Sequence, residues 1–184
     1  MPSRDLDPVT RLTADAVGEP GQRTFYLQAA DARGDQVTLL VEKEQVRRLA
    51  ENLQAWLPEL AAGRPEDPGE AAAAEAGELA LAEPLEPDFR VGQLQLSYDP
   101  ERDRVVVVAT ELLAGDEPEQ LAPELAPEPQ QVRLVVTRPQ LRVLARHGSQ
   151  VVARGRPLCP LCGNPLDPSG HICPALNGHR PTAT

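Results

Sequence analysis

A strand-and-helix pattern that occurs twice is the feature that most constrains the fold of this chain. Residues 37–50 and 132–145 match at seven of fourteen positions when they are aligned at an offset of ninety-five. In both stretches a run of Val and Leu leads directly into apolar residues at helical spacing. We interpret this as two pseudo-repeated β-β-β-α units and predict an α+β body, with an antiparallel sheet and two packed helices. The alternative is that the chain contains no repeat, and that the two stretches match because any amphipathic strand–helix junction resembles another.

Each of the two expected helices carries a single apolar stripe. The apolar positions recur at intervals of three, four and seven residues, which places them on one helical face. In the first helix they are Val46, Leu49, Ala50, Leu53, Trp56, Leu57 and Leu60. In the second they are Leu141, Leu144, Ala145, Gly148, Val151 and Val152. Each helix therefore has one face to bury against a sheet.

Short runs rich in Val, Leu, Thr and aromatic residues predict the strands. In the first unit, residues 9–60, the runs are 9–17, 23–28 and 36–41, with a hairpin loop at 31–35. In the second unit, residues 89–153, they are 89–98, 104–113 and 132–136. Aromatic residues make up only 3% of the chain, so we expect a core of Leu, Val and Ala.

Two acidic, proline-rich stretches separate these patterns. Residues 61–88 hold eight acidic residues against one arginine, and residues 111–130 hold six acidic residues and no basic one. Such composition buries too little apolar surface to offset chain entropy. We therefore predict an acidic flexible linker at 61–88 and an acidic loop at 114–130 within the second unit.

Charge and hydropathy limit the partners. The net charge is −10, yet residues 131–184 carry seven arginines against one aspartate, which keeps nucleic acid open as a partner. Arginine replaces lysine almost everywhere, and Lys43 is the only lysine. The alternative explanation for the arginines at this end is therefore the codon usage of a GC-rich genome. No apolar run approaches the ~20 residues of a membrane span, and the first residues form no signal segment. We expect a cytoplasmic protein with no membrane association.

The C-terminal segment gathers all three cysteines and two of the three histidines within residues 159–179. Its Cys-x-x-Cys motif places two thiolates on one turn, which is half of a tetrahedral zinc site. The third cysteine supplies another sulfur, and one histidine must complete the set. We predict a structural Zn²⁺ site in a zinc knuckle or ribbon at 157–180. Its ligands are Cys159, Cys162, Cys173 and His171, with His179 as the alternative fourth ligand.

Other interpretations of the motif fit less well. A redox dithiol normally caps the start of a helix, where the dipole lowers the thiol pKa, but Gly163 and Pro165 follow here. Three unliganded thiols would be open to oxidation. A catalytic zinc needs an open coordination position, which four protein ligands do not leave. If neither histidine bound, water would take the fourth position and this last distinction would fail.

Four stretches carry a family resemblance: residues 17–28, 42–46, 89–92 and the cysteine pattern at 159–173. Together they resemble an uncharacterised actinobacterial family of conserved repeat proteins of about this length. The resemblance covers nearly the whole chain except its acidic stretches and implies no assigned activity. Genes of this family tend to lie near genes of mycothiol synthesis and of a histidine phosphatase. The position of His179 is often tyrosine in the family, which favours His171 as the fourth ligand.

Enzyme hypotheses find little support in the sequence. The chain has no G-x-S-x-G elbow, no phosphate-binding glycine loop and no H-E-x-x-H motif. His147 lies beside the apolar stripe of the second helix, where we expect a surface or edge position. Residues 18–26 combine a tight turn with Arg23, Thr24 and Tyr26 and could line a small-molecule or anion pocket, although a rigid hairpin is the simpler interpretation.

The leading hypothesis is a non-catalytic, zinc-binding interaction or regulatory protein whose partner is another protein. The first alternative is a nucleic-acid-binding module that uses the basic C-terminal region. The second is an enzyme or small-ligand-binding protein linked to low-molecular-weight thiol metabolism. Salt separates the first two, because nucleic-acid binding weakens steeply with ionic strength through counterion release.

Overall fold

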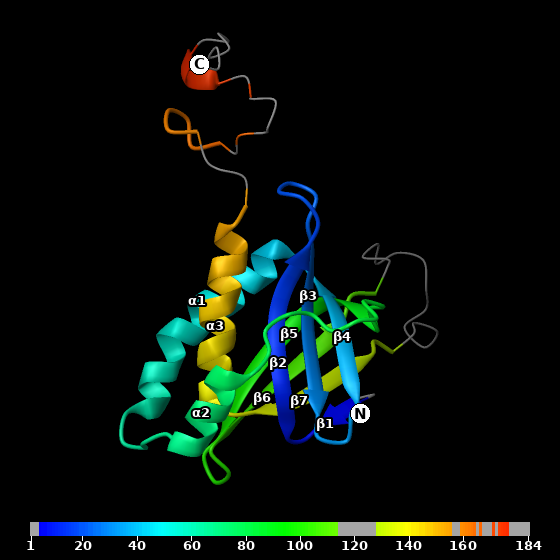
Figure 1. Cartoon of the computed structure of the whole chain (residues 1–184), viewed down its shortest axis with the longest axis vertical. Helices are drawn as coiled ribbons and strands as arrows, with labels where there is room; N and C mark the ends of the chain where they lie inside the picture. The colour runs from blue at the N-terminus through cyan, green and yellow to red at the C-terminus, as the bar shows by residue number, and fades with distance from the viewer. Residues whose placement is uncertain are drawn as a thin grey trace.

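A seven-stranded sheet forms the body of the protein, and α1 and α3 lie side by side against it (Figure 1). The computed structural model describes residues 4–113, 128–155, 159–164, 166, 171 and 173–176. The strands are β1 Arg4–Leu6, β2 Val9–Val17, β3 Thr24–Asp31, β4 Gln36–Val41, β5 Phe89–Asp99, β6 Arg104–Glu111 and β7 Gln131–Val136. The helices are α1 Lys43–Ala61, α2 Pro68–Ala76 and α3 Arg138–Ala153, with a short 3₁₀ turn at Pro174–Leu176.

The α+β class is as predicted, but the sheet is mixed and not antiparallel. Its strand order is β1-β7-β6-β5-β4-β3-β2. Neighbours within β2-β3-β4 and within β5-β6-β7 are antiparallel. Where the two groups meet, β4 and β5 run parallel, and β1 pairs parallel with β7 at the edge. Parallel neighbours need a long crossover connection. Between β4 and β5 this connection consists of α1 and residues 62–88. The three residues of β1 are too few for an alternation signal.

Both long helices begin with the same capping arrangement. The N–H of Glu42 donates to Oε1 of Gln45 at 2.8 Å, and the N–H of Thr137 donates to Oε1 of Gln140 at 2.9 Å. Each glutamine then donates through Nε2 to a carbonyl in the first strand of the other strand group. These carbonyls belong to Val91 in β5 and Val9 in β2. The caps thus satisfy the helix ends and tie each helix across the sheet.

The predicted apolar stripes are the faces that α1 and α3 bury. The buried members in α1 are Val46, Leu49, Ala50, Leu53 and Leu57, and those in α3 include Leu141, Leu144, Ala145, Gly148 and Val151. A Cβ at Gly148 would lie 3.3 Å from Cγ1 of Val46, so the glycine allows the helices to approach closely. Gln54 of α1 also donates to the hydroxyl of Ser149 of α3 at 3.0 Å.

The element order β-β-β-α occurs twice, as β2-β3-β4-α1 and as β5-β6-β7-α3. The first strand of each group has a register shift near its start, between Val9 and Arg11 and between Val91 and Gln93. A duplication would account for both observations, and it stays a prediction, as does the division into units at 9–60 and 89–153. Residues 114–127 of the expected acidic loop lie outside the described residues.

The segment at 61–88, expected from its composition to be a flexible linker, follows a defined path in the structure. It contains α2 and then crosses β2 and β3 (Figure 1). Its acidic residues pair with arginines of the body, namely Glu66 with Arg142, Glu70 with Arg104 and Glu75 with Arg146. Composition alone does not reveal these partners, because they lie far away in the sequence. None of the described helices is long and apolar enough to cross a membrane.

Candidate metal centre

A tight turn presents the first two cysteines of the C-terminal segment. The N–H of Gly163 donates to the carbonyl of Cys159 at 2.9 Å, and the N–H of Cys159 donates to the carbonyl of Asn164 at 2.8 Å. Gly163 has a φ of 72°, a left-handed conformation that glycine adopts without steric cost. The turn brings the side chain of Cys162 back towards that of Cys159, as zinc-binding turns do.

The structure brings together four of the residues that the sequence singled out. The ligand atoms of Cys159, Cys162, His171 and Cys173 all lie within 4.8 Å of one another. Sγ of Cys159 lies 3.9 Å from Sγ of Cys173, and Sγ of Cys162 lies 3.1 Å from Nε2 of His171. Tetrahedral zinc with Zn–S bonds of ~2.3 Å separates two sulfurs by ~3.8 Å, so this donor set fits the ion.

The candidate ligands are largely shielded from solvent. Cys159 and Cys173 are buried and Cys162 is half-buried. Nδ1 of His171 is buried and has no hydrogen-bond partner among the described residues, while its Nε2 faces the sulfurs. Metal-bound histidines normally donate their second N–H to an acceptor that fixes the ring. The position of Nε2 beside the sulfur of Cys162 suits a ligand role, whereas the described residues provide no acceptor that would fix Nδ1.

The thiols differ in proton affinity. Hydrogen bonds from the backbone of Cys162 and Leu161 lower the pKa of the Cys159 thiol. The backbone of Asn164 acts in the same direction on Cys162, but burial and the neighbouring sulfurs of Cys173 and Cys159 outweigh it and raise the pKa of that thiol. Adjacent thiolates repel each other, and a divalent cation between them would favour the deprotonated form of all three.

His179, the alternative fourth ligand, lies outside the described residues. The spacing of the cysteines predicted the cluster, because Cys-x-x-Cys requires only a local turn. Choosing between the two histidines needs the path of the chain after Cys173, which is a tertiary property.

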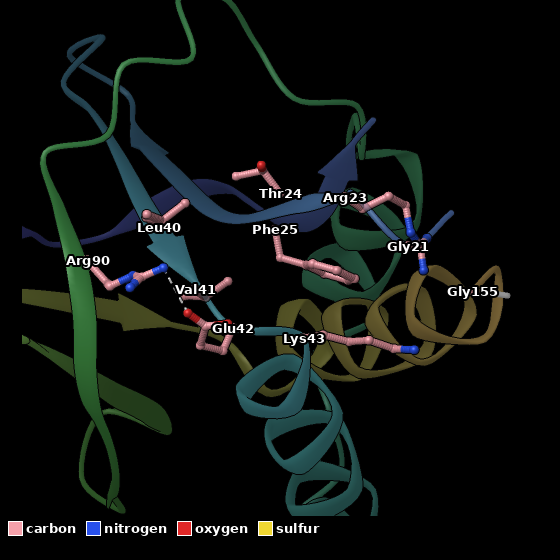
Figure 2. A pocket seen from close by; sticks show the side chains of 10 residues that line it. All are labelled: Gly21, Arg23, Thr24, Phe25, Leu40, Val41, Glu42, Lys43, Arg90 and Gly155. Atoms are coloured by element: carbon pink, nitrogen blue, oxygen red, sulfur yellow. Dashed lines mark ion pairs between the residues drawn. The ribbon is translucent and has the colours of Figure 1, made fainter. Parts of the chain in front are cut away.

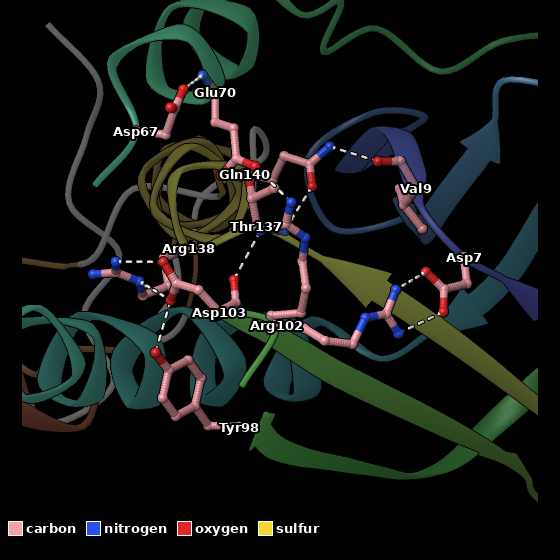
Figure 3. A network of polar contacts seen from close by, with 11 residues as sticks. Asp7, Val9, Asp67, Glu70, Tyr98, Arg102, Asp103, Thr137, Arg138 and Gln140 are labelled. Carbon is pink, nitrogen blue, oxygen red and sulfur yellow. Dashed lines mark hydrogen bonds and ion pairs between the residues drawn. The ribbon is translucent and has the colours of Figure 1, made fainter. Parts of the chain in front are cut away.

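An ion pair between a buried arginine and a half-buried aspartate at the start of α3 escaped the sequence analysis. Arg138 is only 1% exposed, and its guanidinium binds both carboxylate oxygens of Asp103 at 2.8 Å (Figure 3). The hydroxyl of Tyr98 also donates to Asp103, at 2.7 Å. His147, expected at a surface or edge, is instead buried, with Nε2 3.3 Å from Oδ2 of Asp15. The partners are 35 and 132 residues apart, so no local pattern could have indicated either pair.

Fold and site together define an α+β protein with a mixed sheet and a C-terminal Cys₃His cluster able to hold a metal ion. The family model described as "Protein of unknown function (DUF3090)" matches residues 4–173, and the chain belongs to that family. The match includes all four clustered ligands. No curated protein and no solved structure matches the chain.

Proposed function

We propose that this protein is a non-catalytic zinc-binding protein whose C-terminal cluster shapes a docking element for another protein. The convergence of Cys159, Cys162, His171 and Cys173 within 4.8 Å carries the proposal. Three thiolates and one imidazole match the tetrahedral preference of zinc. Four protein ligands fill that coordination shell, which suits a structural role and leaves no position for a substrate.

The surface of the cluster supports a protein partner. Leu161, at the tip of the turn between Cys159 and Cys162, is 59% exposed. Metal ligation would hold this apolar side chain in a rigid, outward position. Exposed apolar side chains on rigid turns contribute to protein interfaces through burial of apolar area. The phosphate backbone of a nucleic acid offers no apolar surface against which Leu161 could be buried.

The charges of the body weaken the nucleic-acid alternative. Four arginines after residue 130 are already neutralised by carboxylates of the same chain. The pairs are Arg133 with Asp5, Arg138 with Asp103, Arg142 with Glu66 and Arg146 with Glu75. Four of the seven arginines that gave this region its basic character are therefore paired with carboxylates of the same chain. Phosphate contacts need free cationic groups.

The metal is tested by elemental analysis of protein purified without added metal. About one zinc per chain is expected, with loss of zinc in Cys173→Ser and His171→Ala and retention in His179→Ala. Wild-type protein purified with no bound metal, and taking up none when zinc is added, would overturn the proposal. Loss of zinc in His179→Ala alone would show that the tail supplies the fourth ligand.

The docking role is tested by capturing partners from native lysate with zinc-loaded protein. Leu161→Ser should keep its zinc but no longer capture the partner protein. A chelator should release the partner from the wild-type protein. Leu112→Ser is the matched control, because Leu112 is an exposed leucine of the body, at 45%. Equal capture by both variants would contradict the docking role. Capture of nucleic acid that disappears steeply with added salt would favour the alternative.

A further inference from the structure

A cavity of about 470 Å³ opens at the end of the body where β3, the start of α1 and the end of α3 meet. Its lining includes Arg23, Lys43 and Arg90, three cationic side chains from separate parts of the chain (Figure 2). Arg23 and Thr24 come from the turn that the sequence singled out as a potential pocket wall. Tyr26 of that turn is not part of the lining. The volume falls in the range of small-molecule sites.

Two of these cations converge on one point. A Cβ at Gly155 would lie 3.0 Å from Nζ of Lys43 and 3.5 Å from Nη2 of Arg23. Figure 2 shows both side chains extending towards Gly155, while Arg90 lies at the other end, paired with Glu42 at 3.0 Å. Gly155 has no positive φ, and a side chain at this position would project between the ends of these two side chains.

The position of Arg23 is set by the fold. Its Nη1 donates to the carbonyl of Val151 at 2.9 Å, and its guanidinium lies over the ring of Phe25, 5.1 Å from the centroid. These contacts hold Nη2 beside Lys43. Among the described residues, neither Nη2 of Arg23 nor Nζ of Lys43 has a hydrogen-bond or ion-pair partner. Two adjacent cations repel each other until an anion lies between them.

The corresponding position at the start of α3 also carries a cation, but that cation already has an anionic partner. Lys43 is the first residue of α1, and Arg138 is the first residue of α3. The β5–β6 hairpin gives Arg138 the carboxylate of Asp103 (Figure 3). The β2–β3 hairpin instead brings a second cation, Arg23, to Lys43 and leaves a cavity. One site is closed by an internal anion, and the other is open to an external one.

We propose that this cavity binds a small phosphorylated molecule, with its phosphate between Arg23 and Lys43. A phosphate monoester is close to a dianion at neutral pH and can neutralise both cations, which a single carboxylate cannot. The buried side chains of Phe25 and Val41 give an apolar wall for the organic part. The proposal is independent of the metal centre, because none of the four clustered ligands lines the cavity.

Calorimetric titration of the full-length, zinc-loaded protein tests the site with phenyl phosphate and with inorganic phosphate. Both are compared with sodium chloride at equal ionic strength, because salt alone screens surface charges. Phenyl phosphate should bind and should bind more tightly than inorganic phosphate. Lys43→Gln should weaken binding about tenfold or more, because it removes one charge-assisted contact, and Lys43→Arg should retain most of it.

Two further variants separate the site from general electrostatics. Arg48→Gln removes one positive charge from the same helix outside the cavity and should leave binding unchanged. Gly155→Val fills the point between the cations without changing charge and should abolish binding. No binding up to about 10 mM, or equal weakening by Arg48→Gln and Lys43→Gln, would overturn the proposal. Inorganic phosphate binding as tightly as phenyl phosphate would contradict the small-molecule assignment.

Discussion

Arg138 is a charged side chain placed where only paired charges are tolerated. It is almost fully buried, and besides Asp103 its guanidinium donates to the carbonyls of Arg64 at 3.2 Å and Pro65 at 3.4 Å. These contacts join the β5–β6 hairpin, the start of α3 and the chain after α1. A buried pair need not stabilise more than an apolar pair would, but removal of one partner leaves a buried charge uncompensated.

Asp103→Asn should therefore lower the free energy of unfolding by about 2–4 kcal/mol. Asparagine tolerates the positive φ of 53° at this position, so the change removes charge without straining the backbone. Urea denaturation measures the loss. Asp7→Asn is the control, because Asp7 pairs with the half-exposed Arg102 and should cost about 1 kcal/mol or less. Equal losses in the two variants would contradict a special role for the buried pair.

The same pair predicts a pH dependence. The hydrogen bond from Arg138 lowers the pKa of Asp103 below its usual value of 3.8. A lowered folded-state pKa contributes stability that is present above the unfolded pKa and is lost as pH falls through the folded pKa. The stability difference between wild type and Asp103→Asn should thus be constant above about pH 5 and shrink below about pH 4. Denaturation series across this range measure it, and a difference that grows in acid would refute the assignment.

At the scale of elements, side chains of β2 and β3 hold the segment after α2, and the buried Gln28 makes two of these hydrogen bonds. Gln28 donates through Nε2 to the carbonyl of Ala82 at 2.9 Å and to the hydroxyl of Thr38 at 3.0 Å, and its Oε1 accepts from the N–H of Ala82 at 2.8 Å. Thr13 of β2 adds a bond to the carbonyl of Leu79 at 2.5 Å. A polar row across the sheet thereby satisfies the backbone of a segment that forms no strand.

Gln28→Ala should loosen this segment around residue 82 while leaving the sheet intact. It removes both hydrogen bonds to Ala82 and leaves the backbone groups of that residue unpaired. Hydrogen exchange at residues 78–85 should become faster, and limited proteolysis should cut there first. Gln54→Ala, which removes only the bond to Ser149 between two helices, should leave exchange in this segment unchanged. Rapid exchange at 78–85 in the wild type would mean that the segment is a flexible linker in solution.

At the scale of the whole molecule, the body and the metal centre depend on different energies. The core of the body consists of Val, Leu, Ala and Phe side chains from the strands, α1 and α3. Burial of this surface stabilises the body by roughly 25 cal/mol per Å² without any metal. The C-terminal segment has few apolar residues, so we expect its folding to depend on metal ligation.

Chelation should therefore unfold the C-terminal segment alone. Hydrogen exchange with and without chelator should show lost protection only after about residue 156, with β3, β4 and β6 unchanged. Cys173→Ser should reproduce the effect without chelator. Loss of protection throughout the sheet would contradict this expectation and would make the metal centre part of the core.

The sequence by itself determined the features that depend on near neighbours. The strands at 9–17 and 36–41, the apolar face of α1 and the turn that pairs Cys159 with Cys162 follow from alternation, helical spacing and local backbone chemistry. Each of these signals arises from residues a few positions apart.

Only the tertiary structure decided which distant groups meet. The parallel pairing of β4 with β5, the bond from Gln28 to residue 82, the pair of Arg138 with Asp103 and the convergence of Arg23 and Lys43 on Gly155 all join residues far apart in the chain. Such contacts depend on how helices and strands pack together. The sequence contains many residues that could form the same hydrogen bond or ion pair with a given side chain. The packing of α1 and α3 on the sheet selects among them, because it sets the distances over which charges and hydrogen bonds act.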